Sequence, residues 1–415
     1  MPVNTSRMKR PSTRTISQWR RIGALPRLWR RAALRNPDVG FRGYFPSGLI
    51  LPRFLLVMCT AILLLLGLVM VFSASSVTSM SINGSPYGIL LKQLTWAVIG
   101  LPLAVVAARL PVRAYRRAAY PTLFLALILL GLVQVPGLGR QVNGSTNWLS
   151  IGPITLQPSE LAKLALVLWG ADLLTRKRKT LSDWRHVVVP LVPIGLVMLV
   201  LVLLGGDLGT SVVIMSILGS ILFIGGSPKR IFGVFGAVVI GGVVALIRWE
   251  PYRLKRVTAL FSPGADPSGS GYQGLHGSFA LAGGGWWGTG LGASREKWGF
   301  LPEAHTDFIF AIIGEELGLT GSVLVLSLFA FLTYAGFRIC IDATDMFVRL
   351  AAGAATTWIT VQALVNIGAV IGLVPITGIP LPLISYGGTA LVLDLITLGM
   401  LISFAGAPSN RDQLE

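Results

Sequence analysis

The chain has 415 residues, of which 53% are hydrophobic and only 13% are charged. That charged share is about half the share in ordinary soluble domains, which excludes a water-soluble globular fold of this size. The apolar excess must face lipid and indicates an integral membrane protein. The formal net charge is +18, but no nucleic-acid-binding motif accompanies it, so we expect no nucleic-acid partner.

Residues 1–53 form a basic extension. Twelve Arg and Lys residues lie in this stretch against a single acidic residue, Asp38. The positive-inside rule predicts that such a segment is cytoplasmic and contacts anionic lipid.

Ten apolar runs of about 20 residues follow and predict about ten transmembrane helices. The runs cover approximately 54–75, 88–108, 119–136, 160–175, 187–204, 209–225, 230–247, 308–336, 347–371 and 388–406. Basic clusters at 109–117, 176–185 and 229–230 mark cytoplasmic loops, which places both termini in the cytoplasm. We therefore predict an all-α polytopic membrane protein with a transmembrane domain at 54–406 and a cytoplasmic tail at 407–415.

Several ionisable residues interrupt the apolar runs or lie at their edges. They are Lys163, Asp207, Glu315, Glu316 and Asp394, with Glu160 at the start of a run. Charges are costly in lipid, so such residues are functional candidates by default. Glu160 and Lys163 share a helix face, where they could form a structural salt bridge or contact a substrate.

A long extracytoplasmic loop is expected at 248–307, between the seventh and eighth helices. It carries Arg253, Arg256 and Lys297, which are either solvated charges of a long loop or contacts for an anionic ligand. Its glycine-rich stretch 283–292 cannot be a regular lipid-facing helix and could let the backbone approach a ligand closely. Trp286 and Trp287 could stack on a sugar or belong to an interfacial aromatic belt.

The densest polar cluster ends this loop. Glu303, His305, Thr306 and Asp307 lie directly before the apolar run at 308–336. Asp307 thus stands at the N-terminus of a helix, where the helix dipole stabilises a carboxylate. Asp307 and Thr306 could simply cap that helix, but Glu303 and His305 make the cluster denser than capping requires.

The segment 375–388 is too rich in Pro and Gly for a spanning helix, so we expect it to be re-entrant and buried against protein or lining a cavity. The two cysteines, Cys59 and Cys340, lie in or beside apolar runs. They indicate neither a disulfide framework nor a metal site.

These segments together resemble the SEDS family (shape, elongation, division and sporulation), and most closely its division-type branch. The matching pieces span nearly the whole membrane region and are residues 157–160 with Lys163, 207–210, 271–273, 290–292, 301–310, 314–318 and 375–388. Asn147 is a departure, because the family often has Arg at this place.

The resemblance implies a ten-helix peptidoglycan glycosyltransferase that polymerises lipid II during septal cell-wall synthesis. It implies a bacterial inner-membrane protein at the division septum, with a class B penicillin-binding protein transpeptidase and other divisome membrane proteins as partners. The family's essential aspartate matches Asp307, which we predict to be the general base that accepts the proton of the attacking sugar hydroxyl.

Residues expected to contact the substrate are Lys163, Glu160, Arg253, Arg256, Lys297, Glu303, His305 and Ser385. We expect no dedicated metal ligands, although a divalent cation (Mg²⁺ or Mn²⁺) stays open as a cofactor. Two other functions also stay open. Intramembrane charges and broken helices suit a lipid II flippase, and a non-catalytic divisome scaffold would share the same partners.

Overall fold

The computed structural model describes residues 52–142, 145–152, 154–177, 184–227, 269 and 271–406, with single residues at 230, 232, 233, 236 and 241. The basic extension at 1–51, most of the predicted run at 230–247, the loop residues 248–268 and the tail at 407–415 lie outside the described residues.

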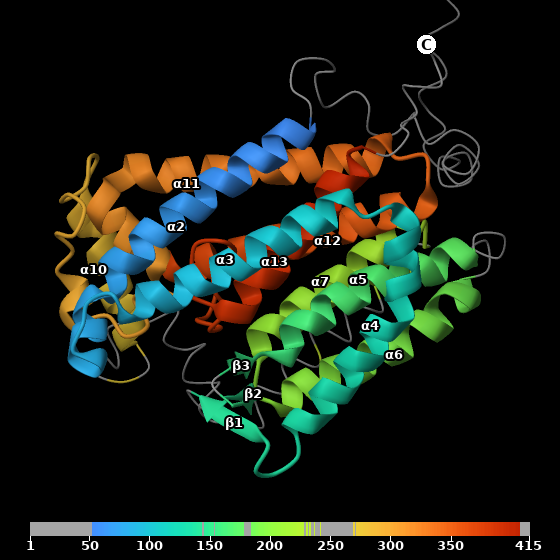
Figure 1. Cartoon of the computed structure of the whole chain (residues 1–415), viewed down its shortest axis with the longest axis horizontal. Coiled ribbons are helices and arrows are strands. Elements are labelled where there is room, and N and C mark those ends of the chain that lie inside the picture. The colour runs from blue at the N-terminus through green and yellow to red at the C-terminus, as the bar shows by residue number, and fades with distance from the viewer. Residues whose placement is uncertain are drawn as a thin grey trace, which may run out of the picture. The chain divides into compact units, whose positions relative to one another are not determined.

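Helices are found at nine of the ten predicted apolar runs within the described part of the chain (Figure 1). They are α2 (Pro52–Asn83), α3 (Gly88–Arg109), α4 (Val112–Val133), α5 (Pro158–Arg176), α6 (Trp184–Leu204), α7 (Leu208–Ile224), α11 (Ile309–Asp342), α12 (Met346–Val370) and α13 (Gly388–Phe404). Five of these, α2, α3, α4, α11 and α12, are long and apolar enough to cross a membrane. The predicted helical multi-pass membrane fold is thereby confirmed.

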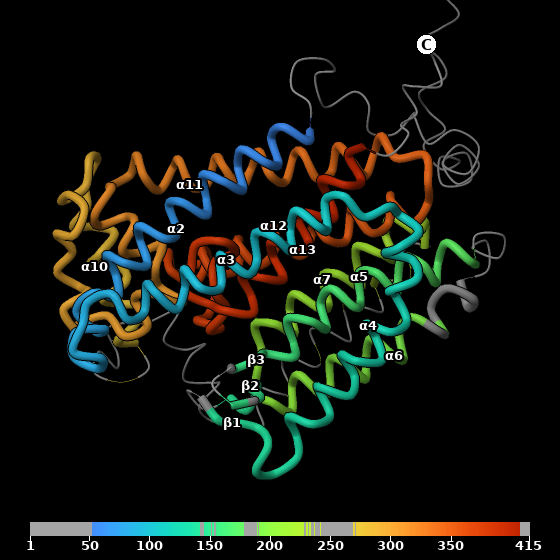
Figure 2. Tube along the Cα trace, viewed as in Figure 1, coloured from blue at the N-terminus to red at the C-terminus, as the bar shows by residue number. Residues whose placement is uncertain are grey.

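Helix α12 lies at the centre of the packing. It contacts α5, α7 and α11, and 72% of its most apolar window is buried inside the protein, against 22% for α3. The exposed face of α3 carries Leu91, Val98 and Leu101, which would be a liability in water but suits contact with lipid tails. Helices α2 and α11, far apart in the sequence, lie side by side (Figure 2).

Helix α5 is a different kind of helix. Apart from Leu161, every residue from Pro158 to Leu174 is buried, between α4, α7 and α12. A helix surrounded by protein does not need an apolar surface all round, so it can carry Glu160, Lys163 and Asp172. This explains why hydropathy is a weak signal for the run at 160–175.

A small sheet departs from the predicted all-α fold, and two short helices lie within the predicted long loop. A three-stranded antiparallel sheet, β1 (Gly139–Val142), β2 (Ser145–Ile151) and β3 (Ile154–Leu156), connects α4 to α5. Helix α10 (Tyr272–Gly284) and the short 3₁₀ helix η4 (Glu296–Trp298) lie within the predicted loop 248–307. The strands are too short to give a clear periodic pattern in the sequence.

Helix α11 is broken at Gly318, whose φ of 70° and ψ of −163° are accessible essentially to glycine alone. A break leaves backbone groups on both sides without their helical partners. The glycine-rich segment 285–290 supplies the missing partners through four backbone hydrogen bonds: Thr289 N to Glu315 O (2.9 Å), Gly290 N to Glu316 O (3.0 Å), Leu319 N to Gly285 O (2.9 Å) and Thr320 N to Trp286 O (3.3 Å).

The glycines of this segment are needed for that close approach. A Cβ atom on Gly284, Gly288 or Gly318 would overlap backbone atoms of the facing segment. From the sequence, the backbone of this glycine-rich segment could approach a ligand closely. In the structure, it approaches the backbone of α11.

Candidate active site

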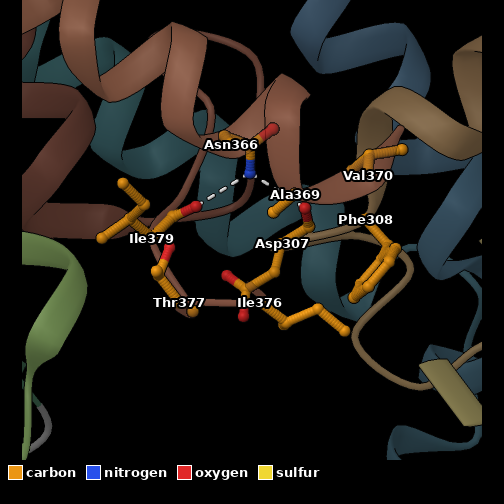
Figure 3. A pocket seen from close by; sticks show the side chains of 9 residues that line it. Asp307, Phe308, Asn366, Ala369, Val370, Ile376, Thr377 and Ile379 are labelled. Atoms are coloured by element: carbon orange, nitrogen blue, oxygen red, sulfur yellow. Dashed lines mark hydrogen bonds between the residues drawn. The ribbon is translucent and has the colours of Figure 1, made fainter. Parts of the chain in front are cut away.

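Asp307 lines a pocket between the start of α11, the end of α12 and the broken segment that follows α12 (Figure 3). The pocket is lined by Asp307, Phe308, Asn366, Ala369, Val370, Ile376, Thr377, Gly378 and Ile379. Asp307 is half-buried and stands one residue before the helix N-cap, Phe308. Thr306, the other capping candidate, donates its hydroxyl back to Glu303.

Gly378 keeps the space beside the Asp307 carboxylate open. Its φ of +73° favours glycine, and a Cβ at this position would lie 3.5 Å from Asp307 Oδ2. A side chain there would be in van der Waals contact with the carboxylate, and glycine leaves this space open.

The backbone of the turn that carries Asp307 is held at three successive carbonyls. The carbonyl oxygens of residues 305, 306 and 307 accept hydrogen bonds from Tyr386 N (2.9 Å), Ser385 Oγ (2.6 Å) and Asn366 Nδ2 (2.9 Å), respectively. Two of these donors belong to the predicted re-entrant segment and the third to α12. The turn therefore has a defined position although it is neither helix nor strand.

Ser385, predicted to contact the substrate, is 4% exposed. Its hydroxyl donates to Thr306 O and accepts a hydrogen bond from Leu381 N at 2.8 Å. The structure thus places this side chain inside the protein, where it joins the two segments that border the pocket.

Glu303 and His305 lie in the same turn as Asp307. The Glu303 carboxylate accepts a 2.6 Å hydrogen bond from Thr306 Oγ1, and the His305 ring lies 5.7 Å from that of Tyr386. Burial lowers the pKa of His305, and the nearby Glu303 charge opposes this only in part. Burial thus favours the neutral form of the ring, which can act as both donor and acceptor.

Glu160 and Lys163 form an ion pair that is almost fully buried, with 2.8 Å between Nζ and Oε1. Lys163 Nζ also donates to Gln362 Oε1 (2.7 Å) and lies 4.8 Å from the centre of the Trp358 ring. The Gln362 amide in turn donates to Pro380 O. Neither charged residue lines the pocket. The pair instead contacts Gln362, which holds the re-entrant segment through the Pro380 carbonyl.

Lys297 is likewise paired within the protein. Its ammonium lies 3.1 Å from Glu316 Oε1, 3.3 Å from Ser73 Oγ and 2.6 Å from Gly292 O. All three N–H donors therefore have a partner. This buried cluster joins the segment around η4 to α11 and α2, and it does not include the pocket.

Arg253 and Arg256, the remaining predicted contacts, lie outside the described residues. Conversely, sequence reasoning missed Asn366 and Gln362. They are four residues apart in the apolar run at 347–371 and so share one helix face. Amides in such a run are a usable signal, although a weaker one than an ionisable residue, because a neutral amide costs less to bury.

Comparison with known proteins places these features in a family. Residues 53–409 match the family of FtsW, RodA and SpoVE, described as "Cell cycle protein". A protein named "Probable peptidoglycan glycosyltransferase FtsW" from Mycobacterium tuberculosis is 43% identical over 85% of this chain and 67% of its own length. Stage V sporulation protein E from Bacillus subtilis is 38% identical over 85% of this chain and 96% of its own.

Solved structures agree. A chain from a structure described as "Structural coordination of polymerization and crosslinking by a peptidoglycan synthase complex" superposes with a TM-score of 0.68 at 29% identity, covering 87% of this chain and 98% of that one. The rod shape determining protein RodA of Thermus thermophilus gives a TM-score of 0.61 at 28% identity, covering 87% and 97%.

The fold and the site define a multi-pass membrane protein with a carboxylate in a pocket at one end of its helices. The chain belongs to the FtsW, RodA and SpoVE family, as its predicted resemblance to the SEDS family indicates, and its relatives include proteins named FtsW.

Proposed function

We propose that this protein is a peptidoglycan glycosyltransferase that polymerises lipid II, with Asp307 as its general base. The names of its relatives support the activity. The observation that carries the proposal is the carboxylate of Asp307, which lines the pocket on a turn held at three successive carbonyls. A catalytic group needs such a defined position, because proton transfer requires hydrogen-bond distance.

The reaction joins two lipid-linked disaccharides. The 4-hydroxyl of the acceptor GlcNAc attacks C1 of the donor MurNAc, and the bond from C1 to the phosphate oxygen breaks. Undecaprenyl pyrophosphate leaves with the electron pair, and the hydroxyl proton passes to the Asp307 carboxylate. The sugar hydroxyl is a poor nucleophile at neutral pH, so removing its proton as the new bond forms lowers the barrier.

The leaving pyrophosphate needs positive charge nearby. Because Lys163 and Lys297 are both engaged in buried ion pairs, Arg253 and Arg256 become the stronger candidates for this role. Glu303 and His305, within four residues of Asp307, are the candidates for contacting the sugar headgroup.

A divalent cation stays a separate question. Within the described ranges, no three or more His, Cys, Asp and Glu side chains are grouped so as to hold a metal ion. A requirement for Mg²⁺ or Mn²⁺ therefore stays a prediction, and the steps above use only groups of the chain itself.

The proposed topology has ten spanning helices, a large extracytoplasmic loop and two cytoplasmic termini. The proposed location is the inner membrane at the division septum. Basic residues at the junction of α3 with α4 support this orientation. The start of α11, which Asp307 directly precedes, lies at the opposite end of the helices (Figure 1), and we place that end at the outer leaflet. The similar complex, described as coordinating polymerization and crosslinking, supports a crosslinking partner, that is, a transpeptidase. That this partner is a class B penicillin-binding protein, and that other divisome proteins join it, stay predictions.

The test is polymerisation of fluorescent lipid II by the purified protein with its transpeptidase partner. We expect glycan strands from the wild type and none from Asp307→Ala. A parallel assay of lipid II flipping in proteoliposomes addresses the transporter alternative. Flipping without polymerisation would support a flippase, whereas complementation of a deletion strain by Asp307→Asn would support a scaffold; either result would overturn the proposal.

A further inference from the structure

Two buried amides on one face of α12 hold the re-entrant segment. Gln362 Nε2 donates to Pro380 O at 3.1 Å, and Asn366 Nδ2 donates to Ile379 O at 2.8 Å. The two side chains are 1% and 2% exposed. Successive carbonyls of the segment are thus bound by residues one helical turn apart, which fixes the segment against α12.

Asn366 differs from Gln362 in what else it binds. Its Nδ2 also donates to the carbonyl of Asp307 itself, at 2.9 Å (Figure 3). A single amide nitrogen therefore joins the backbone that carries the carboxylate to the backbone that forms the opposite side of the pocket. Because both partners are acceptors, the amide orientation is set by chemistry: exchanging its nitrogen and oxygen would bring oxygen against two oxygens.

We propose that Asn366 is a positioning residue for the glycosyl transfer. It holds Asp307 at a fixed place relative to residues 376–379, without touching the reacting atoms. The Oδ1 atom of Asn366 is buried and has no hydrogen-bond partner among the described residues. The side chain is thus held through its donor side alone, so its contribution lies in the two bonds from Nδ2.

The neighbouring contacts explain why the hydrogen bond from Asn366 to the Asp307 carbonyl matters. Ser385 and Tyr386 hold the carbonyls of residues 306 and 305, but both belong to the re-entrant segment. Among the described donors to these three carbonyls, only Asn366 comes from a regular helix of the buried centre. Without it, these hydrogen bonds would join the turn to α12 only indirectly, through the re-entrant segment that Gln362 still holds. The turn could then shift relative to α12, and a displacement of about 1 Å can lower a rate by about 100-fold.

The inference rests on the proposed function, so the experiment is built around Asp307→Ala as the reference. Asn366→Leu keeps the approximate shape of the side chain and removes both donors. In the complex with the transpeptidase partner, we expect kcat for lipid II polymerisation to fall about 10- to 100-fold, with KM changed less than about threefold, because the loss affects the transition state more than binding. Asn366→Ser, a smaller side chain that cannot span both carbonyls, is expected to lower kcat as well.

Thr356→Val is the matched control. Thr356 is fully buried on the same helix, and its hydroxyl donates to the Ala352 carbonyl one turn earlier. The variant therefore loses a buried hydrogen bond without affecting Asp307, and its kcat is expected to equal that of the wild type.

The outcomes separate the two proposals. Normal polymerisation by Asp307→Ala overturns the proposed function. Inactive Asp307→Ala together with wild-type kcat in Asn366→Leu, or in Asn366→Ser should the Leu variant fail to fold, overturns the positioning role alone. A kcat loss in the Thr356→Val control equal to that of the Asn366 variants would also overturn it, because general loosening of α12 would then explain the effect.

Discussion

The approach of α10 to α11 offers a prediction with an internal control. Gly283 and Gly284 are neighbours at the end of α10, but only Gly284 is buried. A Cβ atom on Gly284 would overlap the Gly314 carbonyl of α11, whereas one on Gly283 would meet no atom within 4 Å. The obstacle is backbone, so no change of side-chain rotamer can relieve the overlap.

The two alanine variants separate packing from helix propensity. Each gains at most about 1 kcal/mol from replacing a helical glycine. Gly284→Ala alone carries an overpacking cost of about 1–3 kcal/mol. Because the propensity gain is common to both, the difference in the free energy of unfolding between the variants is about 1–3 kcal/mol, with Gly284→Ala the less stable.

Thermal unfolding of the two variants in the same detergent measures this difference. With about 2–4 °C per kcal/mol for domains of intermediate size, Gly284→Ala is expected to unfold at least about 2 °C below Gly283→Ala. Equal unfolding temperatures would refute the close contact between α10 and α11. They would also weaken the explanation given for the glycine-rich segment.

Two further predictions concern ionisable side chains. Lys297→Met leaves the buried Glu316 carboxylate without its cation, which costs about 3–5 kcal/mol; an unfolding temperature equal to that of the wild type would contradict the buried ion pair. Because burial lowers the folded-state pKa of His305, the unfolded chain binds this proton at higher pH. Stability is then lost as pH falls below about 6.5, by at most about 1.4 kcal/mol per pH unit. His305→Asn should flatten this dependence when unfolding temperatures are measured from pH 7.5 to 5.

Hydropathy is sufficient to place most of the helices, because any helix that meets lipid must present apolar side chains to it. Helix α5 shows where this signal weakens, since protein surrounds it and its buried charges are paired. The strands at 139–156 and helix α10 lie outside the apolar runs, so hydropathy carries no information on them.

The candidate site is only partly predictable. Asp307 can be identified because a carboxylate directly precedes an apolar run within a recognisable motif. The partners of the other polar groups cannot, because they come from distant parts of the chain: Ser73 and Glu316 are 243 residues apart, and Gln93 and Ser385 are 292 apart. A charge in an apolar run reveals that a partner must exist, but not which one.

Lys163, Lys297 and Ser385 illustrate the consequence. Each is predicted from the sequence to contact the substrate, and each is buried and bonded within the protein. Lys163 and Ser385 thus support segments that border the pocket, whereas Lys297 joins the segment around η4 to α11 and α2. The neutral amides Gln362 and Asn366, which hydropathy and charge do not single out, are the ones that join α12 to the pocket.

The central claim is that the Asp307 carboxylate accepts a proton during glycosyl transfer. Asp307→Asn keeps the shape of the side chain and removes its basicity, so its complex with the transpeptidase partner should still bind fluorescent lipid II. Binding and polymer formation measured in the same sample decide the question. The account predicts near-normal binding with a rate of polymerisation lowered about 10²- to 10⁴-fold; bound lipid II that is polymerised at the wild-type rate would contradict it.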